Sequence, residues 1–452
     1  MGNKIDATRL ARACYQLEVF SYGKPVGLLE KDGSDFVFRY HTSAESNDFV
    51  SLLMPVGAQV YRGKIAGQLP APFDMNLPEG GLLQALTNRY GKIVPGFNPL
   101  STLYLVGQNT IGHVTFGEPP AKLSKPKLDL EFLMDSQDTE ELLLRLYEGD
   151  AVFSGIAGAQ PKVLGCADEE SIKKLSDPKT IKDPLRTFKA DNIIVKTSSV
   201  EYPWLAANEF FSLRAAELSG LSVPDTRLFL NGQILLVSRF DRDEKSQPLG
   251  AEDFCSLNAQ VSTEKYVSTY EKMAKTIRYF CSPENLQNDL REFFKSLLLT
   301  CLLHNGDAHM KNFTLLHQRQ NDREEPRVWL SPVYDICTTN AYLAEDMLAL
   351  TLAGSKRYPT LNKIHAFGLG SCSLSKNVMQ SIIEDVAHGI REAAVEMTRY
   401  CDDHPDFHQI VGANMLKCWK AGLDSVNQPF DIHHSWFDIS TQNPRNRPKG
   451  EK

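Results

Sequence analysis

Residues 302–316, LLHNGDAHMKNFTLL, place a short polar run between two apolar stretches. From Asp307 to Asn312 the spacing is D-x-x-x-x-N, as in the catalytic loop of protein kinases, where the aspartate orients the attacking hydroxyl and the asparagine binds a metal ion. The flanks predict a helix before the loop and a strand after it, which would fix the loop against the core. The motif alone is weak, because a surface turn capped by the same two side chains would have the same spacing.

A second carboxylate follows in VWLSPVYDI, where we expect Asp335 at the end of a strand, holding magnesium on nucleotide phosphates. Magnesium prefers hard oxygen ligands and keeps several waters, so Asp335 and the amide oxygen of Asn312 would suffice. The histidines leave an alternative open, a transition-metal site made by His304 and His309 with Asp307 between them. The spacing offers no third ligand for such a site.

A lysine and a glutamate upstream have the types and order of a kinase phosphate site. Lys196 ends the β-branched run NIIVK, like the strand lysine that binds phosphate oxygens in kinases. Glu209, in the helix predicted next, is a natural partner for that ammonium. Each residue alone could equally be an ordinary solvated side chain, so the pair is more informative than either member.

The turn SGIAGAQPK, residues 154–162, departs from the kinase pattern G-x-G-x-x-G. Gly155 and Gly158, on either side of Ala157, still allow close approach to the backbone, and successive N–H groups here could cradle phosphate. An ordinary β-turn is the alternative interpretation of the same residues.

Composition limits the class of protein. The chain has 452 residues, of which 42% are hydrophobic and 23% charged, as in ordinary globular domains. The net charge of −7 gives no global attraction to nucleic acid or anionic lipid. Nine cysteines without a C-x-x-C pair argue against zinc and disulfide frameworks. No apolar run reaches the roughly 20 residues of a membrane span and no signal peptide is apparent, so we expect a cytoplasmic protein.

The first part of the chain, residues 1–120, is predicted to be a β-rich domain. We expect strands in LEVFSYGKPVGLLE, DFVFRYH and LYLVGQNTIGHVTF, and a helix in NLPEGGLLQALTNRYG. EPPAKLSKPKLD, residues 118–129, has the prolines of a linker.

The remainder is predicted to hold a nucleotide-binding portion over 130–245, a helical lobe over 246–437 and a disordered tail over 438–452. In the nucleotide-binding portion we expect a helix near 138–147, then the glycine turn and an exposed insertion over 167–186. A buried strand in DNIIVKTS follows, then a helix from Leu205 to Ser219 ended by Gly220, and a hairpin turning at Asn231-Gly232. In the lobe over 246–437 we expect mainly helices, including KSLLLTCLLH and NVMQSIIEDVAHGIREAAVEMTRY.

In this order, AGAQPK, IIVK, NEFF, SRFDR, NGDAHMKN and SPVYDI resemble motifs of the HipA family of serine/threonine kinases, the toxins of type II toxin–antitoxin systems. VGLL, FVFRY, SLLMP and LPEGGLLQAL resemble the family's N-terminal subdomain, so the resemblance covers roughly residues 15–430. It implies an α+β, two-lobed fold like that of protein kinases, with a β-rich N-terminal subdomain and a helical C-terminal lobe.

Matched position by position, the resemblance makes Asp307 the catalytic aspartate, places Asn312 and Asp335 on Mg²⁺, and puts Lys196 and Glu209 at the phosphates of ATP. The other nucleotide contacts that it implies, beyond the glycine turn, are Ser238, Arg239 and Phe240 of the hinge, His309 and Lys311. In the family the glycine turn carries a serine that the kinase phosphorylates on itself. The matching position here is Gly155, so Ser154, one residue earlier, is the candidate for autophosphorylation.

The implied activity is ATP-dependent phosphorylation of a cellular protein, with an aminoacyl-tRNA synthetase as a family target, leading to growth arrest. The implied partner is a HipB-like helix-turn-helix antitoxin that neutralises the kinase, with DNA contacted only through that antitoxin and no membrane association. The alternative is a binding or corepressor subunit with little kinase activity. Because such a subunit would not need Asp307, Asn312 and Asp335 together, their joint presence favours the enzyme.

Overall fold

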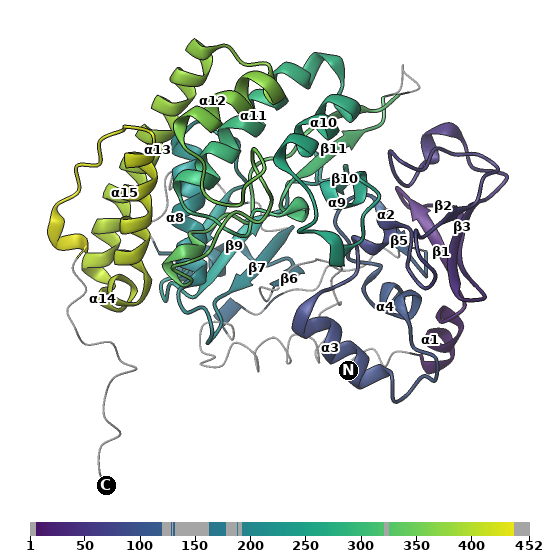
Figure 1. The fold of residues 1–452 in the computed structure, drawn as a ribbon. Coiled ribbons are helices and arrows are strands. Elements are labelled where there is room, and N and C mark those ends of the chain that lie inside the picture. Colours follow the sequence, from purple (N-terminus) through teal and green to yellow (C-terminus); the bar gives the residue numbers. More distant parts are fainter. Residues whose placement is uncertain are drawn as a thin grey trace, which may run out of the picture.

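The computed structural model describes residues 6–119, 128, 130–131, 162–177, 188, 192–320 and 325–437. In Figure 1 the described parts form three sheets and a set of helices, with the N-terminal sheet on one side and the C-terminal helices on the other. None of the described helices combines the length and apolar character needed to cross a membrane. Outside the described ranges lie the predicted helix near 138–147, the turn from 154 to 161, most of the predicted linker and the tail.

The N-terminal sheet is antiparallel and confirms the strands expected in the first two segments. Tyr22 and Gly23 both have positive φ, 49° and 79°, which is the backbone of a tight two-residue hairpin turn between the first two strands along the chain. Side chains such as Val19, Leu29 and Phe38 build an apolar core on this sheet. In spatial order the strands are β4 (Tyr61–Arg62), β3 (Asp35–Tyr40), β2 (Lys24–Asp32), β1 (Gln16–Ser21) and β5 (Val114–Phe116).

One helix of the N-terminal part contains a segment that the sequence interpretation had assigned to a strand. LYLV was expected to be a strand but lies in a helix, because Asn98 caps it by accepting from Leu100 N at 2.9 Å and Pro99 occupies its first position. Only VTF of that segment is a strand. The expected helix in NLPEGGLLQALTNRYG is confirmed. The helices are α1 (Ala7–Ala13), α2 (Ala71–Asp74), α3 (Gly80–Tyr90) and α4 (Pro99–Val106).

A four-stranded antiparallel sheet forms the middle of the molecule. In spatial order it contains β6 (Lys162–Gly165), β7 (Ile193–Thr197), β9 (Ile234–Ser238) and β8 (Thr226–Leu228). The expected buried strand is β7, and the hairpin at Asn231-Gly232 joins β8 to β9. Helix α8 (Leu205–Leu218) is closed at its C-terminal end by Gly220, whose positive φ of 78° confirms the expected cap.

The segment over 167–186 was expected to be an exposed insertion, and its described part differs. Residues Glu169–Leu175 form α7, which buries Ile172 and Leu175. Both side chains pack in a small core with strands β7 and β9. Apolar residues three positions apart on one helical face explain this packing, which the polar composition of the segment hid.

The C-terminal part is mostly helical, as expected, but it also contains a third antiparallel sheet that runs β10 (Gly250–Asp253), β11 (Thr314–Gln318), β12 (Arg327–Leu330). Helix α13 (Lys376–Asp403) packs along α8, and both contribute to the largest apolar core. The main helices of this part are α10 (Tyr270–Phe280), α11 (Pro283–Leu302), α12 (Leu361–Cys372), α13 (Lys376–Asp403) and α15 (Ala413–Ser425), with the short α9 (Phe254–Leu257) and α14 (Pro405–Phe407).

Buried polar contacts fix the N-terminal part against the rest of the chain. Glu252 of β10 accepts hydrogen bonds from Ser51 Oγ at 2.5 Å and from Leu52 N at 2.7 Å. Asp241, just past β9, accepts from Gly112 N at 2.7 Å. Because both carboxylates are almost fully buried, separating the two parts would break these charge-assisted hydrogen bonds. The loop that precedes α3 is thereby placed next to the loop between α11 and β11.

Candidate active site

The loop from Asp307 to Asn312 connects α11 to β11, as the apolar flanks predicted. Asn305 Oδ1 accepts a hydrogen bond from Asp307 N at 3.1 Å and so shapes the start of the loop. Asn312 Nδ2 donates to the carbonyl of Asp307 at 2.9 Å and to that of Asp335 at 3.4 Å. One amide group therefore ties both predicted carboxylate positions together. Among the described residues nothing donates a hydrogen bond to its Oδ1, which stays available as a ligand.

Asp335 lies in a loop, five residues after the end of β12, rather than at the end of a strand as expected. Its φ is +55°, a left-handed conformation that is costly for a residue with a side chain and is often found at functional sites. Its Oδ1 accepts from Lys196 Nζ at 2.7 Å, and its Oδ2 lies 3.8 Å from Lys162 Nζ. Burial alone would raise the pKa of Asp335, but the two ammonium groups hold it well below its usual range.

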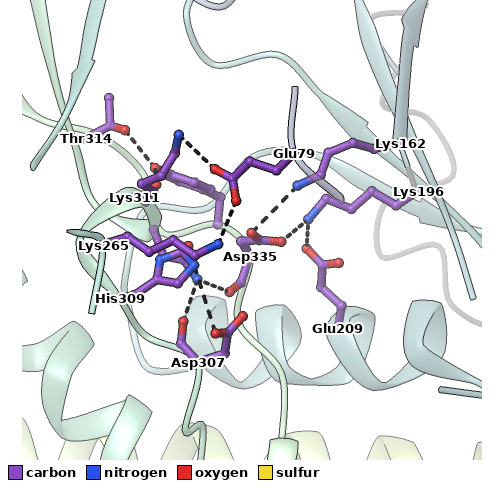
Figure 2. A network of polar contacts seen from close by, with 12 residues as sticks. Glu79, Lys162, Lys196, Glu209, Lys265, Asp307, His309, Lys311, Thr314 and Asp335 are labelled. Carbon is purple, nitrogen blue, oxygen red and sulfur yellow. Dashed lines mark hydrogen bonds and ion pairs between the residues drawn. The ribbon is translucent and has the colours of Figure 1, made fainter. Parts of the chain in front are cut away.

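The structure brings Lys196 and Glu209 together, as the sequence interpretation expected. Lys196 is the next-to-last residue of β7, Glu209 lies in α8, and the ammonium contacts Glu209 Oε1 directly. Both side chains are buried. Burial opposes the charge on Lys196, but Asp335 and Glu209 outweigh it and raise the pKa of the ammonium above its usual value. Figure 2 shows Lys196 between its two carboxylate partners.

Lys162, which the sequence interpretation did not single out, faces the same carboxylate. It begins β6 and pairs in register with Lys196 of β7, so both side chains reach Asp335 from neighbouring strands (Figure 2). Burial lowers the pKa of Lys162 despite the attraction of Asp335, and the charge of Lys196 adds to this lowering. A signal was present in the sequence, because Lys162 closes the glycine turn SGIAGAQPK and begins a strand.

Asp307 has the environment of a proton acceptor. About half of its side chain, 53%, is exposed, and Tyr266 donates a hydrogen bond from its hydroxyl to Oδ1 at 2.8 Å. The carboxylate nevertheless lies among protein atoms on several sides, and this loss of hydration, with the charge of Asp335 nearby, raises the pKa of Asp307 to about 6. It is therefore mostly ionised at neutral pH and close to the range in which a base is effective.

The two histidines of the loop do not form a metal site in the described residues. His309 is buried, and the loss of hydration lowers its pKa to about 4, so its contact with Asp307 Oδ1 at 3.9 Å is not an ion pair at neutral pH. His304 stacks on Tyr358 with ring centroids 4.4 Å apart. No three His, Cys, Asp or Glu side chains gather as metal ligands within the described ranges.

The ammonium of Lys311 forms an ion pair with a carboxylate of the N-terminal part. Glu79, immediately before α3, places Oε1 at 3.0 Å from Lys311 Nζ and Oε2 at 2.7 Å from Lys265 Nζ (Figure 2). Burial would raise the pKa of Glu79, but the two lysines lower it below its usual value. No feature of the sequence points to Glu79 or Lys265, because their partners lie far away along the chain.

The three predicted hinge residues make different contacts in the structure. Ser238 turns inward, since both its N and its Oγ donate to the carbonyl of Asp225, at 2.8 and 3.2 Å. The guanidinium of Arg239 binds Asp241 through two hydrogen bonds of 2.9 and 2.6 Å, so its side chain is engaged in the structure. Phe240 lies against Tyr334 with ring centroids 5.0 Å apart.

Most of these groups line one cavity of about 100 Å³. Its walls combine the loop after α11, the strands of the middle sheet and the segment before α3. Glu209, Ser238 and Asp307 are not among the lining residues, and Gly155, Ala157, Gly158 and the autophosphorylation candidate Ser154 lie outside the described ranges. The residues of the sequence interpretation that line it are Lys196, Arg239, Phe240, His309, Lys311, Asn312 and Asp335.

Comparison with known proteins identifies relatives along nearly the whole chain. The model of the HipA N-terminal domain matches residues 17–117, and that of the HipA-like C-terminal domain matches 154–394, more than half of the chain. A candidate kinase from Sinorhizobium fredii, Y4dM, is 28% identical over 374 residues, which are 77% of this chain and 83% of that protein. A candidate kinase from Haemophilus influenzae is 32% identical over 166 residues, 33% of this chain and 46% of that protein.

Among solved structures, HipA from the Shewanella oneidensis complex of HipA, HipB and operator DNA aligns with a TM-score of 0.63 at 20% identity, covering 92% of this chain and all of that one. This likeness confirms the expected α+β, two-lobed fold with its β-rich N-terminal subdomain. Together with the two family models, it shows that the chain belongs to the HipA family.

Proposed function

We propose that this protein is a serine/threonine kinase that transfers a phosphoryl group from ATP to a hydroxyl of another protein. The observation that carries the proposal is the double hydrogen bond of Asn312, which links Asp307 to Asp335. A base, a metal-binding carboxylate and a metal-binding amide are thereby held in one place. Phosphoryl transfer depends mainly on such positioning and on electrostatic stabilisation.

Lys196 and Lys162 are suited to bind the phosphates of ATP. Lys196 carries its charge, is held by Glu209, and projects into the cavity from the end of a strand. Among the described residues, Lys162 forms an ion pair only with Asp335, at 3.8 Å, so a phosphate oxygen would be a closer partner.

The residues present also fit a magnesium ion. Asp335 and the Oδ1 of Asn312 would hold it, since both are hard oxygen donors and both line the cavity. The ion would supply positive charge to neutralise the phosphates. Lys196 and Lys162 now occupy both oxygens of Asp335, so ligand binding would redistribute these contacts.

Asp307 would orient the hydroxyl of the protein substrate and accept its proton. Its carboxylate is reachable from solvent and mostly ionised at neutral pH. Tyr266 already places a hydroxyl at hydrogen-bond distance from Oδ1. This contact supports the role, because it demonstrates that a hydroxyl fits against the carboxylate from the solvent side.

The biological part of the proposal is a cytoplasmic toxin that phosphorylates a protein such as an aminoacyl-tRNA synthetase and is neutralised by a HipB-like antitoxin. The structural relative that forms a complex with HipB and operator DNA supports such a partner. DNA would then be contacted through the antitoxin. A corepressor subunit with little kinase activity is the alternative, and ATP turnover distinguishes the two.

The test is ATP consumption and protein phosphorylation by the purified wild-type chain and by Asp307→Asn. We expect loss of phosphoryl transfer by at least a hundredfold with Mg-ATP affinity retained, because Asp307 acts on the acceptor hydroxyl. Asp424→Asn is the matched control, since Asp424 is exposed on α15 and pairs only with Lys420 in the described structure. Equal turnover by wild type and Asp307→Asn would refute the proposal.

A further inference from the structure

A side-chain hydroxyl holds the backbone just before Asp307. The Oγ1 of Thr339 accepts a hydrogen bond from Gly306 N at 2.7 Å and lies 2.6 Å from Asp346 Oδ2. It also lies 3.3 Å from the carbonyl oxygen of His304. A hydroxyl has one proton, and the shorter contact to a carboxylate is the stronger one, so Thr339 donates to Asp346. None of these residues is among those that line the nucleotide cavity.

The loop and the segment that carries Asp346 lie in direct contact at Gly306. A Cβ atom at this position would collide with Asp346 Oδ2 and with the carbonyl oxygen of Met347, so a larger residue would force the backbone to shift. Gly306 directly precedes Asp307 in the chain. A movement of this peptide group would therefore also move the carboxylate that follows it.

Asp346 is itself fixed, so it can orient the hydroxyl. Its Oδ1 accepts from Met347 N at 3.0 Å, and its carbonyl oxygen accepts from Asn340 Nδ2 at 3.1 Å. Asn340 directly follows Thr339 in the chain. The threonine and the carboxylate thus belong to one turn that side-chain hydrogen bonds close.

Thr338, in the same turn, is anchored to two helices. Asn208 of α8 accepts from Thr338 N at 2.8 Å and donates to Thr338 O at 3.1 Å. Trp419 of α15 donates from Nε1 to Thr338 Oγ1 at 2.8 Å. All three residues are fully buried. Because Asn208 directly precedes Glu209, this turn connects the helix that carries Glu209 to the loop that carries Asp307.

We propose that Thr339, oriented by Asp346, is a positioning residue for Asp307. Its hydroxyl fixes the peptide group before Asp307 and so fixes the direction from which the carboxylate meets the acceptor hydroxyl. A reacting group misplaced by about 1 Å can lose roughly a hundredfold in rate, so a contact one residue away from the base is close enough to matter. This role rests on the proposed kinase function, whereas the hydrogen bond between Thr339 and Gly306 does not.

The experiment compares Thr339→Val, which keeps the side-chain shape without the hydroxyl, with Thr339→Ser, which keeps the hydroxyl. Mg-ATP consumption by the full-length protein is measured with casein as the acceptor. In Thr339→Val, kcat should fall by about tenfold or more while KM for Mg-ATP stays within about twofold of wild type, because no residue of the nucleotide cavity changes. Thr339→Ser should keep kcat within about threefold of wild type. A purely structural role would not separate kcat from KM in this way.

Amide hydrogen exchange of the peptide that contains Gly306 gives a readout independent of activity. Exchange should be faster in Thr339→Val, because this variant lacks the acceptor for the Gly306 amide. It should be unchanged in Thr339→Ser. The control is Thr398→Val, which removes a hydroxyl that donates within α13 to the carbonyl of Val395 at 2.9 Å, and it should match the wild type in both measurements.

A wild-type kcat in folded Thr339→Val would overturn the proposal, and so would an equal loss of kcat in Thr339→Ser. If Thr339→Val fails to fold by circular dichroism, Asp346→Asn weakens the same contact from the carboxylate side and should lower kcat severalfold at unchanged KM. A wild-type kcat in that variant would then overturn the proposal. If the wild type consumes no ATP while Thr339→Val still exchanges faster at Gly306, the kinase proposal alone fails, so the two failures are distinguishable.

Discussion

Tyr266 donates a hydrogen bond from its hydroxyl to Oδ1 of Asp307 at 2.8 Å, so the proposed catalytic base has a phenol as its partner. Tyr266 lies outside the six-residue motif and is itself 44% exposed. Loss of hydration and the neighbouring Asp307 raise the pKa of the phenol above its usual value, so it stays a donor throughout the neutral range. A substrate hydroxyl would have to replace it or share the carboxylate with it.

This contact predicts the pH dependence of activity. Asp307 must be ionised to accept a proton, and its pKa is about 6, so kcat/KM should fall as the pH decreases through about 6. The hydrogen bond from Tyr266 favours the ionised form. Tyr266→Phe should therefore raise the pKa of Asp307 and move the acidic limb of the profile to higher pH, with activity at pH 8 within about tenfold of wild type.

The measurement is kcat/KM for Mg-ATP-dependent phosphorylation from pH 5 to pH 9. Tyr279→Phe, an exposed tyrosine on α10, is the control and should keep the wild-type profile. A Tyr266→Phe limb that moves to lower pH would show that the phenol opposes ionisation, contrary to this interpretation.

The ion pair of Lys196 and Glu209 predicts a non-additive effect on stability. Lys196→Met would leave Glu209 buried without its cation and should lower the free energy of unfolding by about 3–5 kcal/mol. In Lys196→Met/Glu209→Leu, neither charge remains, so much of that loss should be recovered. Denaturant unfolding of the two single variants and the double variant measures the coupling. If the losses of the two single variants simply add in the double variant, the interaction between the two side chains contributes nothing to the free energy of unfolding.

The contact of Glu79 with Lys311 and Lys265 predicts an effect on nucleotide affinity from outside the kinase motifs. Glu79→Gln should leave two positive charges facing the cavity and so tighten Mg-ATP binding about two- to fivefold, with a steeper dependence on salt. The variant should also be less stable by about 1–3 kcal/mol. Glu30→Gln, which removes a surface pair with Arg39, is the control. Weaker nucleotide binding by Glu79→Gln would indicate instead that the carboxylate positions the lysines for the ligand.

Some parts of the site could be predicted from the sequence because they are local. Asp307 and Asn312 belong to one short loop between apolar segments, and Lys196 follows a β-branched run whose register fixes its direction. Glu209 could be assigned because one helix follows that strand. These four needed only periodicity and spacing along neighbouring elements.

Contacts across the chain could not be predicted in this way. Glu79 reaches the cavity because Glu252 and Asp241 dock the N-terminal part on the body, and no local pattern encodes that docking. Arg239 lines the cavity, and Asp241, two residues away, binds its guanidinium, a pairing that the spacing alone did not predict. The sequence contains both residues but does not show which carboxylate the guanidinium binds.

Lys162 gives the sharpest test of where the phosphates bind. Its ammonium is buried, faces Asp335 Oδ2 at 3.8 Å, and has a lowered pKa, so it is the less well neutralised of the two lysines around that carboxylate. A triphosphate should satisfy it, whereas adenosine brings no charge. Lys162→Met should therefore weaken Mg-ATP binding by about tenfold or more and leave adenosine binding within about twofold. The buried methionine keeps much of the side-chain volume, so folding should be retained. Calorimetry with both ligands gives the two affinities, and Lys174→Met, an exposed lysine of α7 paired with Glu131, is the control. An equal loss for both ligands would place Lys162 at the adenosine end of the cavity or assign it a purely structural role.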